Sequence, residues 1–254
     1  MLSLFREVTL LSARRAARAW PVALSFFVYA AIMLAAANLL APLGMIGGLV
    51  LGLVLAACWS SYLELASQAV AGSKIRLGWH EFRRTFVARL WDVVSVMFAF
   101  WIISLLMGPA LRGPNGERVA AIFGLAVAFF FNAVPELLYQ GHSRSFALLV
   151  ESGRFMIANP VVWLLPNVVF ASLLLLPTGR LAVERPAELL LVFGGTFSSP
   201  LGLAAMVTAW PTWTWPLILF GLHYAMVFRG ILFQKLSSGT GNARLRAFRA
   251  KMKG

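Results

Sequence analysis

The stretches SSYLELASQ, residues 60–68, and NAVPELLYQ, residues 132–140, decide how this chain is organised. Each lies at the end of a long apolar run and carries three polar residues spaced four apart. These are Ser60, Glu64 and Gln68 in the first stretch, and Asn132, Glu136 and Gln140 in the second. A spacing of four places side chains on one face of an α-helix. The same polar stripe therefore occurs twice, 72 residues apart, which indicates an internal repeat of helical units in the same orientation.

The composition is too apolar for a water-soluble domain. Of the 254 residues, 60% are hydrophobic and 12% are charged, whereas soluble domains are about half apolar and a quarter charged. A helix needs about 20 apolar residues to cross a bilayer. We therefore expect an all-α polytopic membrane protein whose single membrane domain covers residues 1–236. Its six predicted transmembrane helices, in three hairpins, are about 21–40, 45–70, 93–111, 119–139, 160–176 and 215–233.

The first apolar run predicts an uncleaved span, because it follows an amphipathic segment, residues 1–20, and is longer than the apolar part of a signal peptide. The single cysteine, Cys58, lies inside the second run. It provides no disulfide framework and no cysteine-based metal site, so we expect it to be a packing residue.

The basic residues predict the orientation. With the N-terminus in the cytoplasm, 18 of the 22 Lys and Arg residues fall in cytoplasmic segments, and only Arg112, Arg118, Arg180 and Arg185 fall outside. Positive residues favour the cytoplasmic side, so six spans with both termini inside satisfy the rule. A seventh span at 186–214 would place the basic tail outside, and we therefore expect that segment to be an outer interfacial or re-entrant element.

The repeat continues beyond each stripe. A glycine, Gly72 or Gly141, is followed by a cytoplasmic segment and then by a span that begins near Trp91 or Trp163. Apolar residues share one helical face in both cytoplasmic segments, more cleanly in the second, which predicts amphipathic helices under the headgroups. The sixth span with its tail, and the basic segment before the first span, suggest a third copy that is split between the two ends of the chain.

The two glutamates have two interpretations. Each lies within about one turn of the predicted inner interface. Either Glu64 and Glu136 pair with cations such as Arg229 and hold helices in register, which we favour, or they flank a cytoplasm-facing cavity for a cation, a proton or a headgroup amine. The candidate residues for an inter-helix network or cavity are Glu64, Gln68, Asn132, Glu136, Gln140, Asn167, His223 and Arg229.

Two further polar residues lie inside predicted spans. Asn167 follows Pro166, and we expect its amide to bind backbone freed by the proline or to bond across helices, rather than to contact a ligand. We expect His223 to be a packed, hydrogen-bonded residue rather than a proton relay, which would need a carboxylate nearby.

No catalytic or metal-binding motif stands out. The histidines, His80, His142 and His223, have neither metal-ligand spacing nor cysteine partners, so we expect no metal and no cofactor. The tail, residues 237–254, joins a flexible linker to basic residues that we expect to bind anionic lipid headgroups, with nucleic acid a less favoured partner. These basic residues are Arg244, Arg246, Arg249, Lys251 and Lys253.

This layout, with a carboxylate near the inner end of a span followed by GHSRSFALLVESGRFMIANPVVW, resembles a broad group of six-span bacterial membrane proteins of unknown function. The group includes the membrane domain attached to some glycerophosphodiester phosphodiesterases. The catalytic domain of those enzymes is absent here, so their activity is not implied. The resemblance covers most of the chain in layout, and its local support is the Glu136 to Trp163 stretch and its weaker copy from Glu64 to Trp91.

From these observations we expect a non-enzymatic protein of the bacterial inner membrane. It would be a subunit or scaffold of a larger assembly, in contact with the bilayer and with a membrane-protein partner or further copies of itself. The alternative is a small permease or lipid-handling transporter, in which the two stripes line a cytoplasm-facing cavity. A membrane enzyme acting on lipid comes third.

Overall fold

The computed structural model of the chain describes residues 2–73, 75, 78–111, 113, 115–140, 146–175 and 215–251. Within these ranges all regular secondary structure is helical, which confirms the all-helical prediction there. The helices are α1 (Leu2–Arg18), α2 (Pro21–Leu40), the 3-10 helix η1 (Ala41–Leu43), α3 (Gly44–Ala71), α4 (Trp79–Ala88), α5 (Leu90–Leu111), α6 (Gly116–Phe130), α7 (Val134–Gln140), α8 (Phe146–Ala158), α9 (Pro160–Leu175) and α12 (Trp215–Lys251). Residues 186–214, expected at the outer surface, lie outside the described residues.

Four predicted spans, 21–40, 45–70, 93–111 and 160–176, match α2, α3, α5 and α9 closely. The prediction of one continuous helix over 119–139 is wrong, because a turn at residues 131–133 separates α6 from α7. Pro135 explains the break: in a continuous helix its ring would clash with the carbonyl of Phe131, and it has no N–H to donate to that carbonyl.

The sixth predicted span begins where α12 begins, but α12 is longer than expected. It continues through Lys251, so the backbone of the predicted flexible linker is helical. The side chains beyond Ser238 lie outside the described part, and this includes the basic side chains of the tail.

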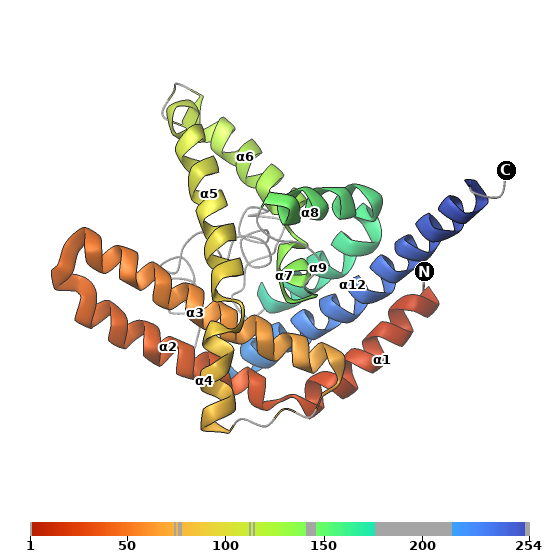
Figure 1. Ribbon diagram of the computed structural model, residues 1–254, viewed down its shortest axis with the longest axis horizontal. Helices are drawn as coiled ribbons and strands as arrows, with labels where there is room; N and C mark the ends of the chain where they lie inside the picture. The colour runs from red at the N-terminus through yellow and green to blue at the C-terminus, as the bar shows by residue number, and fades with distance from the viewer. Residues whose placement is uncertain are drawn as a thin grey trace.

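Three stretches of the described helices are long and apolar enough to cross a membrane: Pro21–Ala71, Trp79–Pro109 and Pro216–Ser238. A fourth is formed by Phe146–Ala158 and Pro160–Phe170 if this pair, bent by 95°, is one broken span. The first stretch is 51 residues long and turns back at η1, so α2 and α3 lie side by side in it (Figure 1). The α5–α6 hairpin runs across the direction of the α2–α3 hairpin rather than parallel to it (Figure 1). Six crossings therefore remain a prediction.

The α2–α3 hairpin depends on a tight turn. Gly44, after η1, has a φ of 54°, a left-handed conformation that glycine adopts without strain. Three residues later, a Cβ on Gly47 would lie 2.1 Å from the carbonyl oxygen of Leu40. Only glycine lets the two helices approach this closely at the turn.

Three helices meet at the centre of the fold: α3, α7 and α12 contact one another in pairs. Each also carries a short flanking helix, because α4 (10 residues) packs on α3, α8 (13 residues) on α7 and α1 (17 residues) on α12. The short helix follows the central helix in the chain for α4 and α8, whereas α1 comes from the opposite end of the chain. An ion pair between Lys235 and Glu7 joins α12 to α1, and these helices run side by side (Figure 1).

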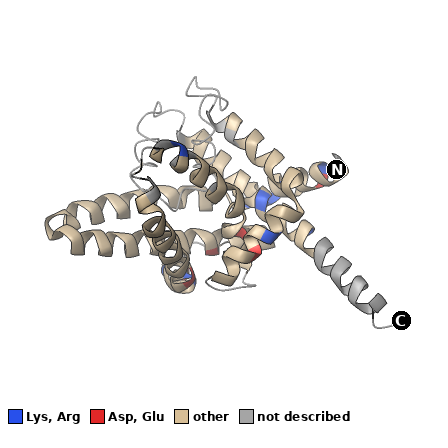
Figure 2. Cartoon of the chain, turned by 90° about the horizontal axis from the view of Figure 1, so that it is seen from above, with Lys and Arg blue, Asp and Glu red and all other residues tan. Residues whose placement is uncertain are grey.

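The outer surface of the hairpins is apolar. Met45 at the tip of the α2–α3 hairpin is 92% exposed, and residues 21–63 contain no Lys, Arg, Asp or Glu. The part of this hairpin formed by residues 21–63 is accordingly tan in Figure 2, while charged residues lie where the helices converge. An apolar surface of this extent suits contact with lipid.

Gly230 allows α12 to approach α7 and α3. An added Cβ would lie 2.2 Å from the hydroxyl oxygen of Tyr139 and 2.5 Å from Cγ2 of Val70. Both of those side chains are buried, so they have little room to move.

We therefore expect Gly230→Ala to lower the free energy of unfolding by about 1–3 kcal/mol through overpacking. Gly48→Ala is the matched control, because nothing lies within 4 Å of its added Cβ. The higher helix propensity of alanine should leave that variant neutral or up to about 1 kcal/mol more stable. Thermal unfolding of both variants in detergent measures the difference, and equal stability would contradict the close approach.

Candidate functional site

A buried ion pair joins α7 to α12. Nε of Arg229 lies 2.7 Å from Oε1 of Glu136, and Nη2 lies 3.0 Å from Oε2, so the contact is bidentate. The two side chains are 1% and 0% exposed. A paired arginine fits a carboxylate well in this geometry, and pairing offsets the large cost of removing both charges from water. Sequence reasoning named Arg229 as a partner of the glutamates, and the structure places it on Glu136.

The turn before α7 supplies further acceptors to this ion pair. Arg229 Nη2 also donates to the backbone carbonyl of Asn132, which the turn leaves outside the regular helix. The side-chain oxygen of Asn132 accepts hydrogen bonds from Trp163 Nε1 at 2.8 Å and from Asn167 Nδ2 at 3.1 Å. The guanidinium carbon of Arg229 lies 5.2 Å from the centre of the Trp163 ring, a cation–π distance. Residues from α7, α9 and α12 thus form one buried network, and Asn167 bonds across helices as expected.

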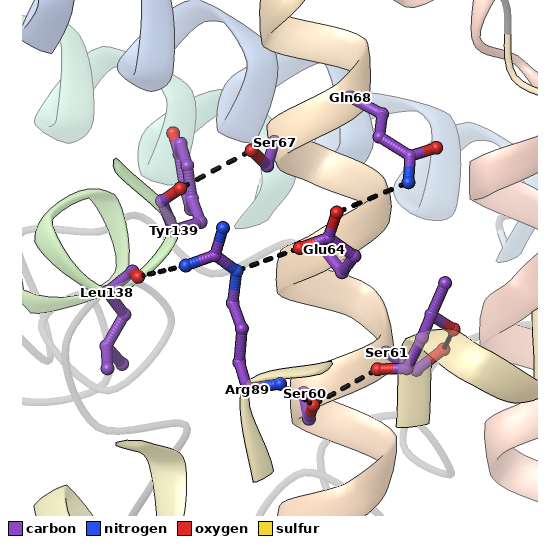
Figure 3. Close-up of polar contacts among 9 residues, drawn as sticks. Ser60, Ser61, Glu64, Ser67, Gln68, Arg89, Leu138 and Tyr139 are labelled. Atoms are coloured by element: carbon purple, nitrogen blue, oxygen red, sulfur yellow. Dashed lines mark hydrogen bonds and ion pairs between the residues drawn. The ribbon is translucent and has the colours of Figure 1, made fainter. Parts of the chain in front are cut away.

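The first stripe forms a second, less buried network (Figure 3). Nε of Arg89 lies 3.0 Å from Oε2 of Glu64, with side chains 19% and 25% exposed. Arg89 also donates through Nη1 to the carbonyl of Leu138 in α7 at 2.6 Å. Gln68 donates to Glu64 at 3.3 Å. Glu64 is therefore paired within its own unit, and Arg89 connects that unit to the second stripe.

Ser60 organises the junction between α4 and α5. Its hydroxyl donates to the carbonyl of Thr85 at 3.1 Å and accepts from the backbone N–H of Arg89 at 2.9 Å. These bonds satisfy backbone groups that the break between the two helices leaves without helical partners. The first residue of each stripe therefore makes a similar contact. Ser60 binds the end of the short helix α4, and Asn132 binds α9, the helix that follows the short helix α8.

Side chains that bind backbone carbonyls join the three central helices and α1. Ser67 of α3 donates to the Tyr139 carbonyl in the last turn of α7 at 3.4 Å, and Arg15 of α1 donates to the Val70 carbonyl in the last turn of α3. Carbonyls in the last turn have no partner within the helix, so these two contacts satisfy them while they connect the units. Gln140 of α7 donates at 3.3 Å to the carbonyl of Gly230, which lies inside α12.

His223 lies apart from both networks. It is buried in α12 as expected, but neither of its ring nitrogens has a hydrogen-bond partner among the described residues, so the expected hydrogen bond is not found. Among the described residues no hydrogen bond or ion pair joins it to a carboxylate. The described part of the chain also contains no group of three His, Cys, Asp or Glu side chains that could hold a metal ion.

An open cavity of about 1110 Å³ lies where the ends of α3 and α7 and the middle of α12 meet α8. Its polar lining comes from amides and hydroxyls: Ser67, Gln140, Asn159, Gln234, Ser237 and Ser238. Its charged residues are Glu151 and Arg154, and its apolar lining includes Val150, Phe155 and Phe233. Of the residues singled out from the sequence, Gln140 lines the cavity, whereas the carboxylates of Glu64 and Glu136 do not.

Sequence reasoning missed two parts of this arrangement. Arg89 was counted only as a cytoplasmic charge, although its position between an amphipathic helix and a span could have marked it as a partner for Glu64. The sequence pattern predicted α8 as an amphipathic helix but not as a cavity wall, and residues 234–238 gave no signal, because the residues that complete the cavity come from distant parts of the chain.

We expect Arg229→Gln to destabilise the protein by about 3–5 kcal/mol, because it leaves the Glu136 carboxylate buried without its cation. The double variant Glu136→Gln/Arg229→Gln should regain part of that loss, since no unpaired charge remains. Arg89→Gln is the control at the more exposed pair and should cost about 1 kcal/mol or less. Unfolding in detergent provides the double-mutant cycle, and additive effects of the two single substitutions would contradict a coupled pair.

Comparison with protein-family models, with curated proteins and with solved structures found no match. The layout-level resemblance to six-span bacterial membrane proteins therefore stays a prediction. The function proposed below rests on the residues and geometry of this chain.

Proposed function

We propose that this chain is an integral membrane protein that binds an amphipathic molecule of the lipid class in the cavity between α3, α7, α8 and α12. The main observation that supports this proposal is the cavity itself. Its volume of about 1110 Å³ is slightly above the roughly 300–1,000 Å³ typical of ligand pockets. Its lining combines aromatic and aliphatic walls with a few polar groups, as ligand pockets do.

The helix beside the cavity supports an amphipathic ligand. Val150 of α8 lines the cavity and is 55% exposed, so it belongs both to the pocket and to the outer surface. Phe146 and Ile157 on the same helix are also exposed. A headgroup can occupy the polar cavity while an acyl chain follows this apolar face toward the bilayer.

The pairing of the carboxylates argues against an ion permease. A carboxylate that carries a cation or a proton must exchange its partner during transport. Glu136 already accepts two hydrogen bonds from Arg229 in a dry site, and Glu64 is held by Arg89 and Gln68. Both glutamates are therefore better suited to joining helices than to binding a transported cation.

The subunit or scaffold function remains a second candidate, and one observation favours it. Gly44, Gly48 and Gly52 are spaced four apart on α3, and each faces open space at the position of an added Cβ. Small residues at this spacing let membrane helices approach closely. A partner helix or a second copy of the chain could pack there without displacing the cavity's ligand.

We also propose the orientation and the repeat predicted from the sequence, with six crossings and both termini in the cytoplasm. The beginning of α1 and the end of α12 lie at the same end of the molecule (Figure 1), which supports termini on one side. The packing of α1 on α12, and of α2 on α12, supports a third unit that is split between the chain ends. The central helix of this third unit is α12. It carries Arg229, whereas the central helices of the other two units, α3 and α7, carry Glu64 and Glu136.

Cysteine labelling tests the orientation. In a Cys58→Ala background, Asn115→Cys between α5 and α6 should react with a membrane-impermeant maleimide in intact cells. Ser238→Cys in α12 should react only after the membrane is opened. The background protein without cysteine is the control, and the opposite pattern would reverse the proposed topology.

Filling the cavity tests the proposed function. Ala158, the last residue of α8, lines the cavity and is exposed, so Ala158→Trp should obstruct the ligand without disturbing the core. Ala88, the last residue of α4, is equally an exposed helix-terminal alanine but does not line the cavity, which makes Ala88→Trp the matched control. We expect native mass spectrometry to find a lipid that copurifies with the wild type and with Ala88→Trp, and at least about tenfold less of it with Ala158→Trp. Equal lipid content in all three proteins, or none in the wild type, would contradict the proposal.

A further inference from the structure

The two charged residues of the cavity lie on the same helix, one turn apart. Glu151 is half-buried and already takes part in a polar interaction. Arg154 is exposed toward the open cavity, and within the described part of the chain no ion pair joins it to a carboxylate. Its guanidinium therefore has its donors available at the cavity wall.

Apart from Glu151, the carboxylates that form ion pairs in the described part of the chain are occupied by other cations. Glu136 is paired with Arg229, Glu64 with Arg89, and Glu7 with Lys235. The remaining polar groups of the cavity are neutral amides and hydroxyls. Arg154 consequently brings to the cavity wall a positive charge that forms no ion pair with a described carboxylate.

Hydrogen-bond donors accompany this charge. Gln234 lines the cavity from α12 and is exposed, so its amide N–H groups are available to a ligand. Tyr139 also lines the cavity from α7, but its hydroxyl is enclosed beside Gly230 and Val70 and is not accessible to a ligand.

We infer that the cavity binds an anionic phosphate-bearing headgroup, with Arg154 as its counter-ion. Arginine presents paired donors that match the oxygens of a phosphate, and the amide of Gln234 supplies neutral donors beside it. The inference rests on the proposed function for the apolar part of the ligand. It departs from the sequence-based alternative, in which glutamates would receive a cation or an amine.

The same chemistry could reach the site from two sources, a phospholipid of the inner leaflet or a free phosphate. The apolar face of α8, with Val150 in the lining and Phe146 and Ile157 exposed, favours the lipid. The experiment therefore uses both kinds of probe.

Arg154→Gln tests the counter-ion. Arg84 is the control: it is also exposed, it lies four residues before the end of α4 as Arg154 does before the end of α8, and it does not line the cavity. Full-length protein in detergent is mixed with dioleoyl phosphatidylglycerol or with dioleoyl phosphatidylcholine, and bound lipid is counted by native mass spectrometry. Inorganic phosphate is the soluble probe, with the thermal unfolding temperature as its readout. The unfolding temperature without ligand verifies that each variant is folded.

We expect the wild type and Arg84→Gln to retain phosphatidylglycerol in preference to phosphatidylcholine. Arg154→Gln should bind about tenfold less phosphatidylglycerol while its weaker binding of phosphatidylcholine is unchanged, and Arg154→Lys should fall between the two. Equal phosphatidylglycerol binding by the wild type and Arg154→Gln would overturn the inference but leave the proposed function standing. Equal losses in Arg84→Gln and Arg154→Gln would also overturn it, since they would indicate general surface attraction.

A different result separates the inference from the proposed function. If inorganic phosphate stabilises the wild type but not Arg154→Gln, while neither lipid binds, the anion site stands and the amphipathic ligand is wrong. If lipid binds without dependence on its charge or on Arg154, the amphipathic ligand stands and the anion site is wrong.

Discussion

The buried pair of Glu136 and Arg229 is the interaction on which the centre of the fold depends. Neither charge could remain in this dry site without the other. Removing an unpaired ion from water costs more free energy than a single packing contact or hydrogen bond contributes. The pair also needs the turn at residues 131–133, which frees the Asn132 carbonyl, and the Trp163 ring beneath the guanidinium. The positions of α7, α9 and α12 are thus determined together by one set of polar contacts in an otherwise apolar protein.

Each of the two repeated stripes contains a glutamate that needs a cationic partner, and the two glutamates are paired in different ways. Glu64 finds Arg89 at the end of its own short helix, in a partly exposed position, whereas Glu136 finds its cation on α12 and is fully buried. Buried ion pairs contribute less to stability than to choosing one arrangement among several. In a bilayer, where apolar helix faces do not distinguish one neighbour from another, such pairs select which helices come together.

The sequence predicted what is local and missed what depends on distant contacts. Apolar runs and prolines located the ends of α2, α3, α5 and α9, because these signals act within a few residues. The break before α7 was also signalled locally, by Pro135 beside the polar Asn132, but the hydrophobicity of the run outweighed that signal. The partner of Glu64 and the walls of the cavity could not be read in this way. Arg89 is 25 residues from Glu64, and the cavity joins residues 67 to 238, so both arise only from tertiary packing.

The way in which charge is distributed also decides what the cavity can recognise. In a protein with few acidic residues, carboxylates used to hold helices together cannot at the same time attract a ligand cation. The 22 basic residues outnumber the 9 acidic ones, and once Glu7, Glu64 and Glu136 have their partners, cations such as Arg154 are left without a carboxylate among the described residues. The same ion pairs that assemble the helices therefore leave Arg154 at the cavity wall without a described carboxylate paired to it. The anion selectivity that we propose for the site would follow from how the fold is held together.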